Sequence, residues 1–432
     1  SYIRAKDLPQ VAPMLADLLK SPDDSVRDTA LEMLGVLQAK EYAPRIADLL
    51  KDANPRVGAH AQTVLVLLGA KEFSPRVAER LKDPEPSVRE SAVEALRNLQ
   101  ATEFTPQIAA LLQDENSSLS VEVIRTLEEF QAREFAPQVA RLLKHEDEDL
   151  RQEAIRALGN LGAKEFAPQV AVFLKDESFN LRAHAAEAIG NLQSPQFVAA
   201  LVELLKDDCW CVRAPAVTAL GKLQAKELIP KLFEMFKGQG EFWTVSWMAA
   251  KALVELQAKE LAPRVADFLK DPDGGLRRRA AYTLGGLQAK EYIPQLAELL
   301  KDPEPYVRGA AIVALGKLQA KEFAPQVAEF LKSQDEYIRL QAAGALGALQ
   351  AKEFVEALLR LLADANEDVR GWAAVSITEL GRQEAVPKEL NQEIGRLFRK
   401  DSEWSRPRLR AVLVRLGFGE AELRHLQYSR RD

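Results

Sequence analysis

Apolar residues near the middle of the second half of the chain follow the spacing of two amphipathic helices. One stripe consists of Val307, Ala311, Leu315 and Leu318. The next consists of Phe323, Val327, Phe330 and Leu331. Steps of three and four residues place such side chains on one helix face. The prolines of "KDPEP" (301–305) end the helix before them, so the pattern predicts a helical hairpin.

The same pattern recurs along the whole chain at a nearly constant period. The first position of an "AKE" signature returns every 31 residues, with one step of 33, at Ala39, Ala70, Ala101, Ala132, Ala163, Ser194, Ala225, Ala258, Ala289, Ala320 and Ala351. A two-helix unit cannot bury both of its apolar stripes alone, whereas stacked units can. We therefore predict an all-α fold, an α-solenoid of about twelve to thirteen two-helix repeats wound as a right-handed superhelix.

The period also predicts how the chain is divided. Residues 1–382 form the repeat array of about twelve repeats, with an irregular unit near 225–257 that contains the longer step. Residues 383–419 lose the signature but keep a second-helix pattern, which indicates a degenerate C-terminal capping repeat. Residues 420–432 form a tail.

The stretch "LLKDPEPYVRGAAIVALGKLQ" (299–319) resembles HEAT-like repeats, in particular the short 31-residue bacterial and cyanobacterial type related to phycobilisome-lyase repeats. The resemblance covers residues 8 to about 382 and implies the fold rather than a function, because this family includes scaffolds, adaptors, lyase subunits and a few enzymes.

In several repeats an Asp precedes an Arg by six residues, and the resemblance implies that such residues form a ladder of hydrogen bonds between neighbouring repeats. The predicted ladder residues are Asp83, Arg89, Asp176, Arg182, Asp207, Arg213, Asp271, Arg277, Asp302, Arg308, Asp364 and Arg370. Gly58, Ser120 and Ser246 replace the Arg in three repeats and leave gaps.

Large aromatic residues occupy variable positions at the start of several second helices, on the side that lines the concave face in this family. They are Phe179, Trp210, Trp243, Trp247, Tyr306, Tyr337 and Trp372. Arg278 and Arg279 directly follow the predicted ladder residue Arg277. These nine residues either pack on neighbouring repeats and line a solvated helix face, or form a stripe that binds a partner. We favour binding for the aromatics, because Val, Leu and Ala already fill the core stripe.

The bulk composition bears on partners and compartment. A net charge of −6 argues against a general nucleic-acid binder. Two cysteines, Cys209 and Cys211, are too few for a disulfide framework, and we interpret both as packing residues in a reducing compartment. With no signal peptide or membrane span in the sequence, we expect a cytoplasmic protein. Because the chain begins with Ser rather than Met, we expect a processed or trimmed piece of a longer protein.

Catalytic and metal-binding patterns are scarce. The four histidines, His60, His145, His184 and His425, lie far apart, and we find neither a phosphate-binding glycine loop nor a nucleophile motif. We expect no enzyme activity, no cofactor and no metal.

The sequence favours a non-catalytic scaffold that holds a protein segment or ligand on its concave face, as the sensor part of a larger signalling protein. We expect a protein or peptide partner rather than a membrane or nucleic acid. The alternatives are a bilin lyase-like or chaperone subunit for phycobiliproteins, a nucleic-acid-binding HEAT-like solenoid, and a purely mechanical spacer.

Overall fold

A computed structural model describes residues 8–114, 116–238 and 243–381, and every regular element in these ranges is helical. The chain divides into two compact units, residues 1–223 and 224–432. The predicted capping repeat 383–419 and tail 420–432 lie outside the described residues.

Unit 1 contains seven helical hairpins, each with a first and a second helix. The first helices are α1 (Leu8–Leu18), α3 (Ala43–Asp48), α5 (Ser74–Glu79), α7 (Thr105–Ala110), α9 (Ala136–Arg141), α11 (Ala167–Ala171) and α13 (Val198–Leu204). The second helices are α2 (Asp24–Val36), α4 (Pro55–Leu67), α6 (Pro86–Asn98), α8 (Ser117–Glu129), α10 (Glu148–Asn160), α12 (Phe179–Asn191) and α14 (Trp210–Lys222).

Unit 2 contains five further hairpins among its described residues. Its first helices are α15 (Ile229–Phe236), α17 (Ala262–Ala266), α19 (Ile293–Glu298), α21 (Ala324–Glu329) and α23 (Val355–Arg360). Its second helices are α16 (Trp243–Glu255), α18 (Gly274–Gly286), α20 (Pro305–Lys317), α22 (Glu336–Ala348) and α24 (Glu367–Gly381). The twelve described hairpins form an α-solenoid, as the periodicity predicts. The handedness of the superhelix stays a prediction.

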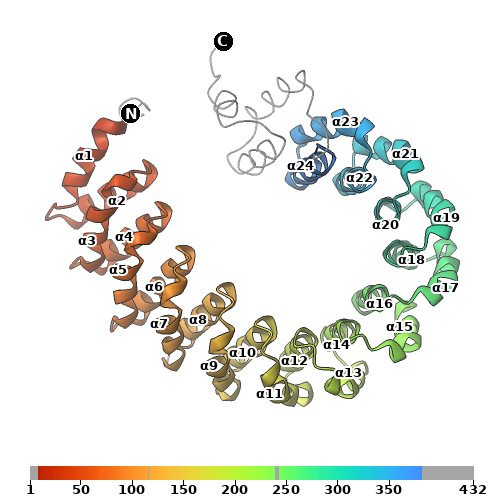
Figure 1. The fold of residues 1–432 in the computed structure, drawn as a ribbon, viewed down its shortest axis with the longest axis horizontal. Coiled ribbons are helices and arrows are strands. Elements are labelled where there is room, and N and C mark those ends of the chain that lie inside the picture. The colour runs from red at the N-terminus through yellow and green to blue at the C-terminus, as the bar shows by residue number, and fades with distance from the viewer. Residues whose placement is uncertain (1–7, 115, 239–242, 382–432) are drawn as a thin grey trace, which may run out of the picture. The chain divides into compact units, whose positions relative to one another are not determined.

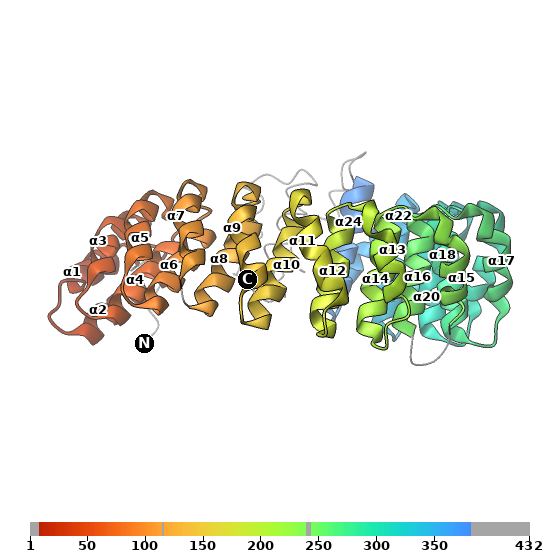
Figure 2. The same ribbon diagram turned by 90° about the horizontal axis from the view of Figure 1, so that it is seen from below.

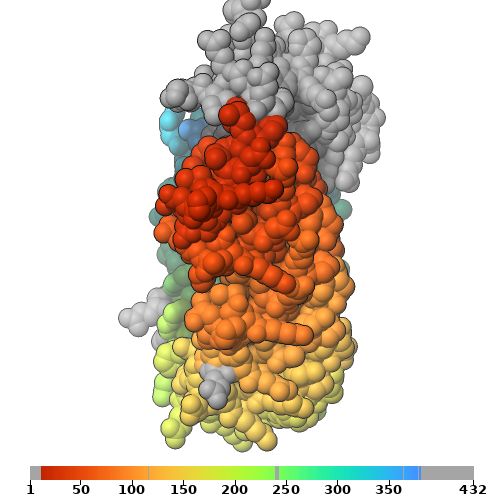
Figure 3. Space-filling view, turned by 90° about the vertical axis from the view of Figure 1, so that its left-hand side faces the viewer, coloured from red at the N-terminus to blue at the C-terminus, as the bar shows by residue number. Residues whose placement is uncertain are grey.

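Within each unit the hairpins stack in chain order and form two layers (Figures 1 and 2). The even-numbered second helices form one layer, toward which the row curves, and the short first helices form the other (Figure 1). We call these the inner and outer layers of each unit. In the space-filling view of unit 1, successive repeats follow one another as bands in contact (Figure 3). Most residues of the apolar stripes, such as Leu315 and Val327, are buried, whereas Phe323 and Phe330 are partly exposed.

Glycines near the ends of some second helices allow the next second helix to approach very closely. A Cβ atom on Gly285 of α18 would lie 2.8 Å from the Cα of Ala314 in α20, and one on Gly190 of α12 would lie 2.9 Å from the Cα of Ala219 in α14. Non-bonded Cβ atoms do not come this close to backbone. The glycines therefore set the spacing of these helices in the inner layer.

The turn between hairpins uses a left-handed backbone conformation that the sequence pattern did not predict. Nine glutamines adopt it with φ between 51° and 59°, and Gly69 and Gly162 adopt it in two other repeats. Gln350 donates a hydrogen bond from Nε2 to the carbonyl of Gly347 at 3.1 Å, and Gln288 donates to the carbonyl of Lys317 in the next repeat, also at 3.1 Å. These bonds offset the cost of about 1 kcal/mol or more that the left-handed conformation imposes on a residue with a side chain.

Arginines of several second helices link their own hairpin turn to the next one. Arg277 donates to its own turn at the carbonyl of Asp271 (2.8 Å) and to the carboxylate of Asp302 in the next repeat (2.7 and 2.9 Å). Among the predicted ladder residues, Arg182 likewise pairs with Asp207, and Arg89 pairs with Asp114 of the following repeat. The ion pair thus joins an Arg to an Asp 25 residues later, whereas the Asp six residues earlier offers its carbonyl.

Two ladder pairs were missed in the sequence because a serine stands six residues before the Arg. Arg27 pairs with Asp52 at 2.8 Å, and Arg339 pairs with Asp364 at 2.7 Å. Arg308 and Arg370 each bond the carbonyl of the Asp six residues earlier at 2.7 and 2.8 Å, as does Arg213 at 2.5 Å.

An arginine from the following repeat fills one of the gaps in the ladder. Arg80, which lies after α5, is buried and donates from Nη1 to the carbonyl of Leu50. A Cβ atom on Gly58 would lie 2.8 Å from this Nη1 atom, so Arg80 occupies the space beside the missing side chain. Burial lowers the pKa of Arg80.

Replacing Gly285 with alanine should destabilise the protein by about 1–3 kcal/mol, the usual range for overpacking, because the backbone of Ala314 cannot rotate away. Gly371 of α24 is the matched control, since no atom lies within 4 Å of its would-be Cβ, and Gly371→Ala should stabilise by up to about 1 kcal/mol. Urea unfolding followed by circular dichroism measures both. Equal effects would contradict the close-approach account.

The ladder also predicts how stability depends on pH. Burial alone would raise the pKa of Asp302, but hydrogen bonds from Arg277 and the Glu304 N–H outweigh it and hold the pKa below its ordinary value of 3.8. A lowered pKa means that the pair stabilises the fold above about pH 4 and that this contribution is lost as pH falls through the folded-state pKa.

Asp302→Asn should therefore cost about 2 kcal/mol at neutral pH, as expected for a charge-assisted hydrogen bond, and should flatten the loss of stability as pH falls below about 4. Asp267→Asn, at an exposed position, serves as the control for removing one carboxylate. Urea unfolding at a series of pH values measures the effect. A wild-type pH profile in both variants would show that the Arg277–Asp302 pair does not stabilise the fold.

Candidate functional site

All of the sequence-predicted aromatic residues lie on second helices, in the inner layers of the two units. Phe179 and Trp210 are the first residues of α12 and α14 in unit 1, and the other five belong to unit 2. Five of the seven are exposed: Phe179 50%, Trp210 50%, Trp243 62%, Tyr306 37% and Trp372 48%. Trp247 and Tyr337 are partly buried. Exposure of this extent leaves most of these rings available for contact.

Three rings of unit 2 also pack on glycines of the preceding second helix. A Cβ atom on Gly274 would lie 2.7 Å from the hydroxyl of Tyr306, and one on Gly344 would lie 3.2 Å from the Trp372 ring. Tyr337 covers Gly309 in the same way. Packing on neighbouring repeats therefore accounts for how these rings are held. It does not account for the exposed surface of Tyr306 and Trp372.

Aromatic rings and cations gather at the centre of the inner layer of unit 2. The rings of Trp247 in α16 and Tyr282 in α18 lie 4.7 Å apart between centroids. The Arg278 guanidinium lies 4.8 Å from the Trp247 centroid and 6.0 Å from that of Tyr306. The Lys317 ammonium lies 4.8 Å from the Tyr282 centroid. These distances are those of cation–π contacts.

Sequence reasoning missed Tyr282 and Lys317. Tyr282 follows Arg278 by four residues, so the helical period places both on one face, and this signal could have found it. Lys317 is the last residue of α20 and resembles the lysines of other repeats, so only the structure distinguishes it. Burial, and then the charge of Glu255, raise the pKa of Tyr282.

Arg278 and Lys317 keep their charges free of carboxylate partners. Neither forms an ion pair with a residue in the part of the chain that the structure describes. Burial lowers the pKa of Lys317. By contrast, the neighbouring Arg277 is bound on both sides in the ladder.

Arg279 was predicted as a binding residue, and this prediction is wrong. Its side chain is 5% exposed and donates to the carbonyls of Phe236 (3.1 Å) and Gly238 (2.9 Å). Ser246 replaces a ladder arginine here, and its hydroxyl also donates to Gly238 at 3.0 Å. Arg279 therefore fills a gap in the ladder, as Arg80 does in unit 1, and burial lowers its pKa.

An apolar pocket of about 180 Å³ lies beside Trp372 in the inner layer of unit 2. It is formed by three consecutive second helices, α20, α22 and α24, and is lined by Val313, Gly316, Lys317, Leu340, Gln341, Gly344, Ala345, Ala348 and Trp372. Lys317 belongs to both the pocket and the aromatic–cation cluster. We call the combined surface of Trp247, Arg278, Tyr282, Tyr306, Lys317 and this pocket the inner-face patch.

A second pocket of about 430 Å³ lies in the outer layer of unit 2, between the α19 and α21 hairpins. Its lining includes Phe323, Gln326 and Phe330 together with Glu298, Lys301 and Glu329. Positions such as Phe323 carry the same residue type in most repeats, so this pocket follows from the scaffold pattern. In the inner-face patch, by contrast, the positions of Trp247, Arg278 and Tyr282 carry different residue types from one repeat to the next.

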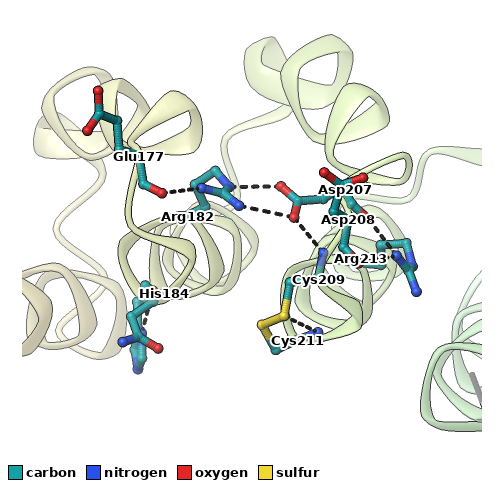
Figure 4. The surroundings of a disulfide bond; sticks show 9 residues. Glu177, Arg182, His184, Asp207, Asp208, Cys209, Cys211 and Arg213 are labelled. Atoms are coloured by element: carbon teal, nitrogen blue, oxygen red, sulfur yellow. Dashed lines mark hydrogen bonds and ion pairs between the residues drawn. A yellow bond between two sulfur atoms is a disulfide. The ribbon is translucent and has the colours of Figure 1, made fainter. Parts of the chain in front are cut away.

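In unit 1, Trp210 stands between two cysteines that form a disulfide (Figure 4). Cys209 and Cys211 have their Cα atoms 5.1 Å apart, within the usual range for a disulfide, because they flank the first residue of α14. The expectation of two reduced packing cysteines is therefore wrong. Disulfides persist mainly in oxidising compartments, so the cysteines no longer support the cytoplasmic expectation.

The disulfide also takes part in capping α14. The Cys209 sulfur accepts the Cys211 N–H at 3.3 Å, and the Cys209 N–H donates to the ladder residue Asp207 at 3.0 Å (Figure 4). The ladder therefore fixes the start of the helix that carries Trp210.

Within the described ranges, no group of three or more His, Cys, Asp or Glu side chains is placed to hold a metal ion. In the same ranges, no helix has both the length and the apolar character needed to cross a membrane.

Comparison with solved structures finds similar chains at low sequence identity. Kap121p is 14% identical with a TM-score of 0.45 over 96% of this chain and 57% of Kap121p. Kap95p, in a structure that describes its binding to RanGDP, is 12% identical with a TM-score of 0.47 over 95% of this chain and 66% of Kap95p. The chain thus spans less than two thirds of the length of either protein.

Comparison with curated proteins finds no significant match. The sequence profile of HEAT repeats matches residues 12–97, 104–173, 167–253, 209–281, 238–316, 262–334 and 324–388. These matches cover nearly all of the described residues, and their boundaries overlap the helical hairpins of both units. The chain belongs to the HEAT repeat family.

Proposed function

We propose that the chain is a non-catalytic binding scaffold that holds a segment of a partner protein on the inner-face patch of unit 2. The observation that carries the proposal is the pocket beside Trp372, which shares Lys317 with the aromatic–cation cluster. A preformed apolar pocket with a few polar groups at its edge is the usual form of a binding site.

The residue types of the patch support binding rather than packing alone. Trp, Tyr and Arg are enriched among residues that dominate binding energies at protein interfaces. Trp372 is 48% exposed although its ring already rests on Gly344. Because that contact holds the ring in place, little side-chain entropy remains to be lost when a partner covers it.

The arrangement of the patch favours an extended segment as the partner. Its residues come from α16, α18, α20, α22 and α24, which follow one another along the row. Stacked repeats present such elongated surfaces along their inner side. A segment that runs across the second helices can reach both the cluster and the pocket.

Site-specific photo-crosslinking in the full chain tests this proposal. A photoreactive residue at Gln341, in the pocket lining, should capture a defined segment that mass spectrometry identifies. The same residue at Gln326, in the outer pocket, is the matched control and should not capture that segment. Equal capture at both positions would refute the proposed site.

The captured segment, made as a synthetic peptide, should bind the wild-type chain and lose at least about tenfold in affinity with Trp372→Ala. Val375→Ala removes another exposed apolar side chain from α24, outside the pocket lining, and should leave the affinity unchanged. Thermal unfolding of both variants checks that each remains folded. An unchanged affinity in Trp372→Ala would contradict the proposal.

A further inference from the structure

The chemistry of the partner segment can be read from the charges of the inner-face patch. We propose that this patch recognises an acidic side chain placed next to a bulky apolar one in the same segment. The inference rests on the proposed function and adds the class of ligand.

Arg278 is oriented to receive an anion. Its guanidinium carbon lies over the Trp247 ring, 4.8 Å from the ring centroid, and 6.0 Å from the centroid of Tyr306. A guanidinium that stacks on a ring keeps its N–H groups in the plane free for a carboxylate, which it can bind through two hydrogen bonds. No carboxylate among the described residues occupies that position.

Lys317 provides the second positive charge. Its ammonium lies over the Tyr282 ring, and partial burial without a carboxylate partner lowers its pKa. A bound carboxylate would supply the missing partner and favour the charged ammonium. The Trp247–Tyr282 ring pair connects the two cations, so together they form one positively charged spot in a chain of net charge −6.

Carboxylates around this spot limit how much negative charge it accepts. Burial is the main cause that raises the pKa of Tyr282 and of Tyr306, and the charges of Glu255 near the first and of Glu304 and Asp273 near the second raise it further, so all three carboxylates lie close to the cluster. They would repel a polyanion that extends beyond the two cations. The arrangement therefore fits one or two acidic side chains and disfavours a nucleic-acid backbone, whose charges continue in both directions.

The pocket sets the second requirement. Its lining is mainly aliphatic and aromatic, and its volume of about 180 Å³ exceeds the roughly 150 Å³ of an engineered apolar cavity that admits benzene. One leucine- or phenylalanine-sized side chain therefore fits. Because Lys317 borders the pocket and also carries one of the two charges, the acidic and apolar side chains must be neighbours in the segment.

Three short synthetic peptides in a common Gly/Ser background test the inference with the full chain. The first carries a leucine flanked by glutamates, the second replaces the glutamates with lysines, and the third replaces the leucine with serine. Fluorescence anisotropy at low salt measures their affinities. The first peptide should bind at least about tenfold tighter than either of the others, and added salt should weaken it.

Charge-removing variants locate the interaction. Arg278→Gln and Lys317→Gln should each weaken the first peptide about five- to tenfold and should not weaken the second peptide. Lys290→Gln removes the same charge from an exposed position of the outer layer and should change nothing. Thermal unfolding confirms that each variant folds.

Tighter binding of the lysine peptide, or equal affinities for the three peptides, would overturn the inference. An equal loss of affinity for the first peptide in Lys290→Gln and Lys317→Gln would also overturn it. The proposed function is tested separately by crosslinking. A captured segment that binds through Trp372 but lacks an acidic residue would refute the acidic chemistry and leave the scaffold function intact.

Discussion

The close approach of successive second helices is the constraint on which the inner layers depend. Three glycines each face a small residue of the following repeat: Gly285 faces Ala314, Gly316 faces Ala345, and Gly347 faces Ser376. Because these glycines have no side chain, the backbones of successive second helices lie nearly in contact. Side chains of one repeat can therefore contact side chains of the next. The Trp247–Tyr282 and Tyr282–Lys317 contacts link neighbouring repeats of this layer, and glycines likewise seat Tyr306, Tyr337 and Trp372. The surface proposed to bind a partner is thus a consequence of the stacking.

The ladder supplies hydrogen-bond donors to the hairpin turns, because each turn leaves carbonyl groups without backbone partners. A second-helix arginine satisfies them in most repeats, and in several, as with Arg277, it also pairs with the aspartate of the next turn. Where Gly58 and Ser246 replace that arginine, Arg80 and Arg279 supply a guanidinium from elsewhere. The requirement therefore belongs to the turn, and different residues can meet it.

Much of the fold follows from the sequence because period, proline positions and apolar stripes repeat many times. Twelve hairpins with second helices starting near residues such as Pro305 and Glu336 follow from that pattern. The left-handed glutamine turns could not be predicted, because glutamine has no general preference for that conformation and gains it here through a side-chain hydrogen bond. The sequence predicted that Asp and Arg residues form the ladder. The 25-residue separation between an Arg and the Asp it pairs with, as in Arg277 and Asp302, is visible only once neighbouring turns are placed together.

The candidate site was predictable in part. Exposed aromatics such as Trp243 and Trp372 were found from their register, whereas the role of Arg279 was misjudged because its partners are carbonyls 41 and 43 residues away. Lys317 and the pocket were invisible in the sequence, since the pocket depends on the space left by Gly316 and Gly344. The disulfide was missed because two cysteines two residues apart were judged by number rather than by their place at a helix start.

Hydrogen–deuterium exchange of the full chain, with and without the crosslinked segment bound, tests the central claim most directly. Binding on the inner-face patch predicts slower amide exchange in α16, α18, α20, α22 and α24, with the outer helices α19 and α21 unchanged. Protection confined to the outer helices or to unit 1 would contradict the account and place the binding surface elsewhere.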